Sequence, residues 1–328
     1  MLKLKKRGEL MKKFSSYYQN LDDNIKKYFK ILYPYIPIEL QEYIEIIIRL
    51  SGIDYFCGMK YASNHMYNFK YNISRLDHSI SCALETLRFT DDFEMVLSAL
   101  YHDCNTPIFS HVIDYLYKDY IKQEKSEENN DLFLLENVVL QKLLARDNYN
   151  IKRIINPKQH PIIDNNRPKL CIDRLDGILL TSLAWTKTIT LDDVEEIINN
   201  TSLLKNDDQE LEIGFLNPLI AKKLVTMEDT INTYCKSNND TFMMLLAADM
   251  IKYCINSCYI KESELYTLKE SEFIEIIKEN YYYDLQLALL YDAFTKMEKV
   301  TSVNIKNTKT RVIKPLYLNQ DNKIIRMN

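Results

Sequence analysis

The chain has 328 residues, of which 46% are hydrophobic and 27% are charged, and its formal net charge is −4. This balance is typical of a globular protein with a large core, and it lacks the clustered excess of Lys and Arg that marks a nucleic-acid-binding protein. Five Gly and eight Pro are few for this length, which argues against β-sandwiches and glycine-rich phosphate loops.

The beginning of the chain, "MLKLKKRGELMKKF", is basic, but no apolar run follows it. We therefore expect neither a signal peptide nor a membrane anchor. The seven Cys are odd in number and include no CxxC pair, so they fit neither a disulfide framework nor a zinc knuckle. Reduced thiols in a cytoplasmic protein are the expected state.

Most of the chain shows helical periodicity, most clearly in "TDDFEMVLSALYHD", residues 90–103. The apolar positions that recur with spacings of three and four are Phe93, Val96, Leu97, Leu100 and Tyr101. This spacing predicts a helix that is buried on most sides. Thr90 or Asp91 is a suitable N-cap, and Pro107 would stop the helix soon after His102 and Asp103.

Further segments with a helical period follow along the chain. They are residues 38–50, 75–89, 109–123, 131–145, 170–184, 191–199, 217–235, 240–257, 271–277 and 281–298. A turn cluster at 206–208 predicts a small hairpin within residues 202–217, and the tail, 310–327, predicts one or two short strands. The expected fold class is therefore mostly α, a helical bundle with small β appendages in the C-terminal half.

Five His occur in the chain, and three of them lie between residues 78 and 111. Arg75 precedes His78 by three residues, so both side chains emerge on one helix face. His102 and Asp103 end the next helix, and Asp173 lies on a polar face of a later one. Two imidazoles and two carboxylates suit a divalent ion with mixed nitrogen and oxygen ligands, and a neighbouring Arg could hold a phosphate group bidentately.

Structural alternatives exist for each of these residues. A single His near a helix end is more often a cap or a satisfied core residue, and a carboxylate on a helix is normally a solvated side chain. The apolar surroundings of His102 and Asp103 favour the metal interpretation, because a buried Asp needs a partner. We interpret Trp185, after the Asp173 helix, as a core residue rather than a site residue.

The order "SRLDHS", then "HDCNTPIFSH", then Asp173-Arg174-Leu175-Asp176 resembles the HD-domain phosphohydrolases. In particular it is similar to their deoxynucleoside triphosphate triphosphohydrolase branch, and the resemblance touches roughly residues 45–320. It implies an HD-domain helical bundle that binds a divalent metal ion, whether Mn, Mg, Fe, Co, Ni or Zn. The metal ligands that the resemblance implies are His78, His102, Asp103 and Asp173. The phosphate contacts that it implies are Arg75, Arg174 and His111.

The chain departs from the pattern of this branch at four places. Thr106 stands where the family has an internal His, and a second catalytic His is replaced near Ser126. The remaining catalytic candidates are His111 and the acids Glu127 and Glu128. Gly177 stands where the family has an aromatic that excludes a ribose 2′-OH, and Thr181 where it has an Asp that holds the 3′-OH. We therefore expect poor discrimination between ribo- and deoxyribonucleotides, and slow or no turnover of dGTP.

Three regions are expected along the chain. Residues 1–36 would form an N-terminal helical extension, residues 37–200 the HD-domain core with the metal site, and residues 201–328 a C-terminal helical region with short β hairpins, packed on the core.

The sequence thus predicts a metal-dependent phosphohydrolase that acts on a nucleotide or a related phosphorylated small molecule through metal-activated water. Two alternatives stay open. One is a non-catalytic HD protein that binds a nucleotide or a protein partner, motivated by the missing His residues. The other is an HD nuclease acting on single-stranded nucleic acid, which the acidic balance disfavours. We expect no membrane partner, and a homo-oligomer is an open alternative.

Overall fold

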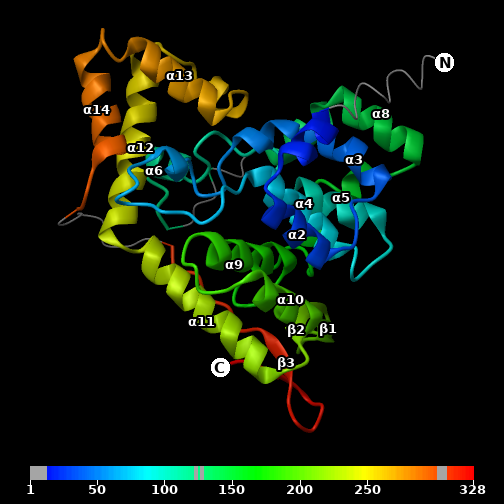
Figure 1. The fold of residues 1–328 in the computed structure, drawn as a ribbon. Coiled ribbons are helices and arrows are strands. Elements are labelled where there is room, and N and C mark those ends of the chain that lie inside the picture. Colours follow the sequence, from blue (N-terminus) through cyan, green and yellow to red (C-terminus); the bar gives the residue numbers. More distant parts are fainter. Residues whose placement is uncertain (1–12, 122–124, 126–128, 301–308) are drawn as a thin grey trace.

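A computed structural model of the chain describes residues 13–121, 125, 129–300 and 309–328. The fold class is confirmed: the chain is mostly helical and has a small four-stranded sheet in its C-terminal half (Figure 1). The α-helices with assigned bounds are α2 (Asp23–Leu32), α3 (Ile38–Ile44), α4 (Arg75–Thr86), α5 (Phe93–Tyr101), α6 (Val112–Leu116), α7 (Asn130–Glu136), α8 (Val138–Asp147), α9 (Ile172–Ala184), α10 (Leu191–Asn199), α11 (Pro218–Cys235), α12 (Asn238–Asn256), α13 (Glu270–Asn280) and α14 (Leu285–Lys296). The 3-10 helices are η1 (Glu45–Gly52), η2 (Met59–Tyr61), η4 (Ile151–Arg153), η5 (Pro157–Gln159) and η6 (Glu262–Tyr266).

The strands form one sheet in the order β1-β2-β3-β4. Their bounds are β1 (Thr201–Lys205), β2 (Leu211–Phe215), β3 (Leu316–Leu318) and β4 (Ile324–Arg326). β1 and β2 pair antiparallel, which confirms the predicted hairpin, and β3 joins β2 in parallel before turning back into β4. No helix in the described part of the chain combines the length and the apolar character that a bilayer-spanning segment needs.

Helix α4 lies at the centre of the core, and each of its twelve residues is buried. Ser74 caps its N-terminus in a capping box with Asp77, so the first turn is held in place from both sides. The helix packs against α5, α9, α2 and η1. Because α4 is surrounded by apolar side chains, its polar residues Arg75 and His78 need partners on the neighbouring helices.

The loop between α5 and α6 differs from the predicted helix over 109–123. Phe109 and Ser110 adopt positive φ angles of 57° and 45°, and the helix starts only at Val112. Such a conformation costs a non-glycine residue about 1–3 kcal/mol. Tertiary contacts offset this cost, because the Phe109 ring is fully buried and its N–H donates to Glu270 Oε1 at 3.0 Å.

Three other predicted helix boundaries are also different. Asp92, rather than Thr90 or Asp91, caps α5. The predicted helix 131–145 is interrupted at Asn137, whose side chain accepts hydrogen bonds from two backbone N–H groups and begins α8. Asn competes well for such bonds outside a helix. The predicted helix 38–50 ends at Ile44 and continues as η1, with a non-helical conformation at Ile47.

Candidate metal centre

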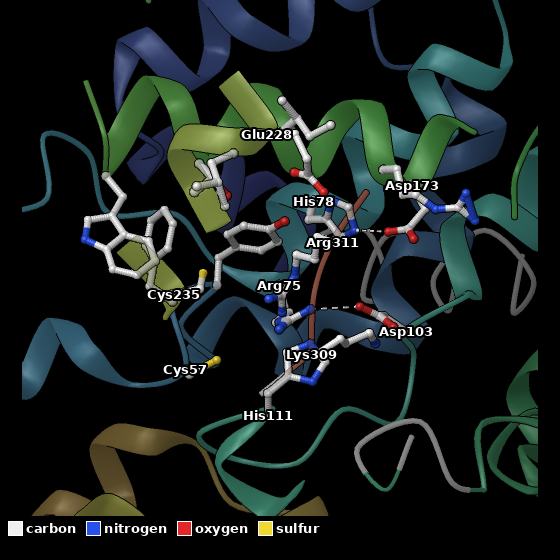
Figure 2. Close-up of a pocket in the computed structure, with 18 of the residues that line it drawn as sticks. Cys57, Arg75, His78, Asp103, His111, Asp173, Glu228, Cys235, Lys309 and Arg311 are labelled. Carbon is white, nitrogen blue, oxygen red and sulfur yellow. Dashed lines mark hydrogen bonds and ion pairs between the residues drawn. The ribbon is translucent and has the colours of Figure 1, made fainter. Parts of the chain in front are cut away.

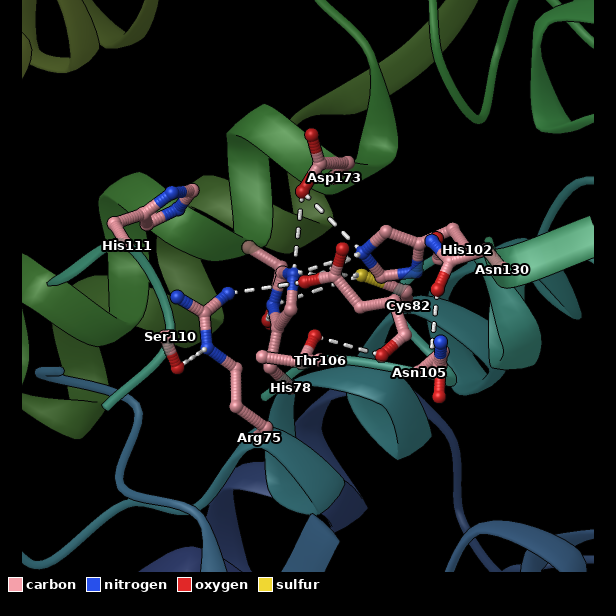
Figure 3. Close-up of polar contacts among 12 residues, drawn as sticks. Arg75, His78, Cys82, His102, Asn105, Thr106, Ser110, His111, Asn130 and Asp173 are labelled. Atoms are coloured by element: carbon pink, nitrogen blue, oxygen red, sulfur yellow. Dashed lines mark hydrogen bonds and ion pairs between the residues drawn. The ribbon is translucent and has the colours of Figure 1, made fainter. Parts of the chain in front are cut away.

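Three helices of the core bring the four predicted metal ligands together. His78 projects from α4, His102 and Asp103 follow the end of α5, and Asp173 lies in the first turn of α9 (Figure 3). His78 Nε2 lies 3.1 Å from His102 Nε2 and 3.2 Å from Asp173 Oδ1. His102 Nε2 lies 3.5 Å from Asp173 Oδ1 and 3.7 Å from Asp103 Oδ2. Residues that are up to 95 positions apart in sequence therefore converge on one point.

The other ring nitrogen of each imidazole is held by an acceptor. His78 Nδ1 donates to Asp176 Oδ2 at 2.6 Å, and His102 Nδ1 donates to the backbone oxygen of Ala99 at 2.8 Å. These acceptors keep a proton on each Nδ1 and turn the Nε2 lone pairs toward each other. At this separation the two Nε2 atoms and the carboxylate of Asp173 repel one another unless a proton or a metal ion lies between them.

The distances and charges of the group fit a divalent metal ion. Ligand nitrogens and oxygens lie about 2.0–2.2 Å from such an ion, which places neighbouring ligands about 3.0–3.5 Å apart. Burial alone would lower the pKa of His102, but Asp103 and Asp173 outweigh it and raise this pKa to about 10. Burial opposes ionisation of Asp173, yet the two imidazoles hold its pKa well below the usual range. The two carboxylates, Asp103 and Asp173, thus make this cluster of side chains favourable for a positive charge.

The candidate centre opens on one side into a cavity of about 770 Å³ (Figure 2). Both Asp173 and His78 line this cavity, and their side chains are 37% and 2% exposed, respectively. Besides the candidate ligands, the cavity is lined by two kinds of residue that matter below. The cationic ones are Arg75, Lys158, Arg167, Arg174, Lys309 and Arg311. The aromatic ones are Tyr55, Phe56, Tyr67, Phe69, Tyr115 and Trp185.

Arg75 lies beside the candidate ligands and lines the same cavity as His78, as its position one turn earlier predicts. Its Nη1 donates to Asp103 Oδ2 at 3.0 Å, and its Nε donates to Ser110 Oγ at 3.1 Å. The guanidinium carbon lies 5.0 Å from the centre of the Tyr55 ring. These contacts fix the orientation of the guanidinium next to the ligand Asp103.

His111 lines the cavity on the far side of Arg75 from His102 (Figure 3). Its Nδ1 donates to Asp114 Oδ2 at 2.9 Å, which fixes the orientation of the ring. Burial lowers the pKa of His111; Asp114 opposes this, and the positive charges of Arg75 and Lys309 add to it. At neutral pH the ring is therefore uncharged.

Arg174 lines the cavity but contacts the loop before α9. Its Nη1 donates to Asn165 Oδ1 at 2.7 Å, and it also bonds the backbone oxygens of Asn165 and Lys169. These bonds shape the loop, and a phosphate contact by Arg174 stays a prediction. The candidate catalytic residues Glu127 and Glu128, with Ser126, lie outside the described residues.

Two of the noted departures have structural consequences. Thr106 is buried, and its hydroxyl donates to the backbone oxygen of Asp103 at 2.8 Å, so it contributes to the loop rather than to the cavity wall. A Cβ added at Gly177 would lie 3.0 Å from the Tyr55 hydroxyl. The cavity wall at Gly177, which the sequence predicts to lack a bulky side chain, is therefore bounded by Tyr55. Sequence reasoning missed this residue.

Other site residues were also missed by sequence reasoning. Asp176 belongs to the Asp173-Arg174-Leu175-Asp176 motif, but its bond to His78 was not predicted. Trp185, expected in the core, lines the cavity, as do Asp240 and the tail residues Lys309 and Arg311. The only signal for the tail residues is a two-residue alternation of charged with uncharged side chains in "KTRVI".

Besides the group of His78, His102 and Asp173, two further groups among the described residues have ligand atoms within 4.8 Å of one another. The first joins Cys82 to His78 and His102; burial raises the pKa of the Cys82 thiol, which disfavours the thiolate that binds metal. The second joins Asp173 to Asp164 and Cys171. Both groups overlap the four predicted ligands.

Comparison with known proteins finds distant relatives. No family model matches the chain. The chain is 26% identical to the uncharacterized protein YdhJ of Bacillus subtilis over 132 residues, and this match covers 40% of this chain and 38% of YdhJ. The chain is 19% identical to the metal-dependent phosphohydrolase cns2 of Cordyceps militaris over 220 residues, and this match covers 63% of this chain and 60% of cns2. The matches thus span less than two thirds of either relative.

Proposed function

We propose that this protein is a metal-dependent phosphohydrolase that acts on a phosphorylated small molecule, with a nucleotide as the favoured substrate class. One observation carries the proposal: the Nε2 atoms of His78 and His102 face each other at 3.1 Å beside Asp173, with both Nδ1 atoms held by acceptors. A divalent cation bound between these groups would offset the repulsion among them. The distant similarity to a protein named a metal-dependent phosphohydrolase supports the same chemistry.

In this proposal His78, His102, Asp103 and Asp173 hold the metal ion. A bound divalent ion would supply Lewis acidity, polarising a phosphoryl oxygen and activating a water molecule. Arg75, fixed by Asp103 and Ser110, would neutralise charge on the phosphoryl group as it develops. His111, with its ring oriented by Asp114, would accept or return a proton through Nε2.

A nucleotide suits the remainder of the cavity. The volume of about 770 Å³ is within the usual range for small-molecule sites. The partly buried Trp185 provides an aromatic side chain for contact with a base, and Asp240 also lines the cavity as a polar group. Thr181 also lines the cavity and carries no charge. We therefore keep the expectation of weak sugar discrimination, with Tyr55 as the side chain that could restore it.

The test begins with metal analysis of the purified protein. A phosphate-release screen over dGTP, GTP, dAMP and AMP with Mn²⁺, Mg²⁺ and Co²⁺ then follows. His102→Ala should lose both bound metal and phosphate release, because the variant removes a ligand nitrogen. His65→Ala is the matched control, since His65 is exposed and does not line the cavity. Metal binding without phosphate release from any substrate would contradict the enzymatic proposal.

That contrary result would favour the second candidate, a non-catalytic HD protein that binds a nucleotide. The observation that motivates it is Thr106, which is buried and hydrogen-bonded to Asp103, so that this position supplies no acid to the leaving group. Melting-temperature shifts with nucleotides but without turnover would identify this function. The three-region division and a homo-oligomeric state stay predictions. The cavity takes residues from both the 37–200 and the 201–328 region.

A further inference from the structure

The turn over residues 102–105 follows α5 and carries two of the candidate metal ligands, His102 and Asp103. A helix leaves its last carbonyl oxygens without partners of its own, and His102 is the C-cap of α5. The Asn105 N–H, three residues later, could donate to the His102 oxygen and close a tight 3-10 turn. In the structure both backbone groups bond the side chain of another helix.

Asn130, in the first turn of α7, supplies this side chain (Figure 3). Its Nδ2 donates to the His102 backbone oxygen at 2.7 Å, and its Oδ1 accepts from the Asn105 N–H at 2.9 Å. A carboxamide carries a donor and an acceptor side by side, so it can bond both backbone groups at once. The Asn130 amide therefore bridges the two ends of the 102–105 turn and takes the place of a direct bond between them.

The start of α7 makes further contacts with the same turn. The Cys104 thiol donates to the Asn130 backbone oxygen at 3.6 Å, and Asn105 Nδ2 donates to the Asn129 backbone oxygen at 3.5 Å. The backbone of Asn130 is thus held against the turn independently of its side chain. Removal of the amide alone should therefore leave α7 in place.

The loop after the 102–105 turn is held by a different part of the chain. The Ile108 N–H donates to the Leu265 backbone oxygen at 2.8 Å, and the Phe109 N–H donates to Glu270 Oε1 at 3.0 Å. These bonds involve η6 and α13, not α7. A change at Asn130 should therefore alter the turn that carries the ligands and leave the conformation at Phe109 unaltered.

We propose that Asn130 is a positioning residue for the metal centre, which sets the affinity for the metal ion by fixing the backbone from which His102 and Asp103 project. This inference rests on the function proposed above. Asn130 does not line the cavity, so it acts through the turn and not through contact with a substrate. Without the amide, the turn can close on a direct bond between residues 102 and 105, which moves both ligands relative to the other two.

Competition with a metal chelator measures this role. Asn130→Ala should weaken the affinity for Co²⁺ by about 10–100-fold, the scale on which partners that orient metal ligands act. The visible absorption of the Co²⁺-loaded protein should also change, because these bands report the geometry of the ligands. An unchanged affinity would overturn the inference.

Asn137→Ala is the matched control. Asn137 is half-buried like Asn130, and it bonds two backbone N–H groups at the start of α8, away from the cavity. Loss of this cap should lower the midpoint of urea unfolding but leave the Co²⁺ affinity and the spectrum unchanged. An equal loss of metal affinity in both variants would show a general effect of stability and overturn the role of Asn130.

Amide hydrogen exchange of the metal-free protein tests the bridge without a metal ion. In Asn130→Ala the Asn105 N–H should exchange at least about tenfold faster, because it loses its acceptor. The Phe109 N–H, bonded to Glu270, should exchange at the wild-type rate. Unchanged exchange at Asn105 would overturn the bridge.

The two proposals fail in distinguishable ways. A wild type that binds no metal ion would refute the metal centre and the hydrolase, whereas faster exchange at Asn105 in Asn130→Ala would still retain the bridge. Metal-dependent phosphate release, with equal metal affinity in wild type and Asn130→Ala, would retain the hydrolase and refute the positioning role.

Discussion

The two ends of the cavity are built in opposite ways. At the metal end, His78 and His102 come from the packed helices α4 and α5, and their side chains are 2% and 8% exposed. At the far end, Trp185 and Asp240 are only partly buried, and Arg311 comes from the tail of the chain. A site needs rigid support where ligand geometry decides the chemistry, whereas substrate selection tolerates walls from loops and tails. We therefore expect substitutions at the metal end to affect chemistry, and those at the far end to affect substrate choice and pH response.

The largest expected difference between the ends is in metal binding. Asp173→Ala should strip the metal and reduce phosphate release by at least about 10²–10³-fold, the scale on which one charge-stabilising group acts. Asp240→Ala, which also removes a cavity carboxylate, should retain the metal. Metal content and phosphate release measured on both variants check this. Equal metal loss in the two variants would show that the ends are not separate.

A smaller effect is expected behind the metal ligands. Asp176 accepts hydrogen bonds from His78 Nδ1 at 2.6 Å and from the Tyr28 hydroxyl at 2.5 Å. Asp176→Ala should weaken metal affinity by about 10–100-fold, because the His78 ring loses its orienting partner. Tyr28→Phe keeps the Asp176 carboxylate and should weaken the metal affinity much less. Competition of each variant with a metal chelator gives the affinities, and equal losses would contradict the assigned role of Asp176.

Arg75→Lys should lower phosphate release about tenfold while leaving metal content unchanged, because Lys keeps the charge but loses the planar fork that bonds Asp103 and Ser110. Arg146→Lys is the control, since Arg146 pairs with Glu42 and Asp147 outside the cavity. Steady-state kinetics on the best substrate provide the measurement. Unchanged release on every phosphorylated substrate would exclude a phosphate contact by Arg75.

The smallest expected effect is a change in pH dependence at the far end. Burial raises the pKa of Asp240 to about 7, although a hydrogen bond from Tyr67 and the charge of Arg311 oppose the shift. The unfolded chain releases this proton near about pH 4, so the folded state binds more protons between about pH 4 and 7. The free energy of unfolding should therefore fall across this interval as the pH rises.

Asp240→Asn has no ionisable group at this position. The free energy of unfolding of the variant minus that of the wild type should therefore be larger at pH 8 than at pH 5. Urea unfolding of both proteins at the two pH values gives the difference, in which contributions from other groups cancel. A stability difference that is independent of pH would show that the Asp240 carboxyl ionises normally in the folded protein.

Local pattern in the sequence was sufficient for the helical class, the hairpin and much of the order of elements. The apolar spacing around Leu97 predicted α5 within a few residues, and the turn cluster at 206–208 predicted the β1–β2 pair. The three-residue interval between Arg75 and His78 placed both side chains at one cavity. These features depend on neighbours within one or two turns, which a single sequence displays directly.

Only the tertiary structure decided which distant residues meet. The bond from His78 to Asp176 joins positions 98 apart, Tyr55 lies beside Gly177, and the tail of the chain adds Lys309 to the lining of the cavity. The left-handed Phe109 likewise follows from its burial and its bond to Glu270 rather than from local preference. Periodicity predicts which face of an element is buried. Which element packs against that face depends on the packing of the whole core, where burial outweighs local backbone preference.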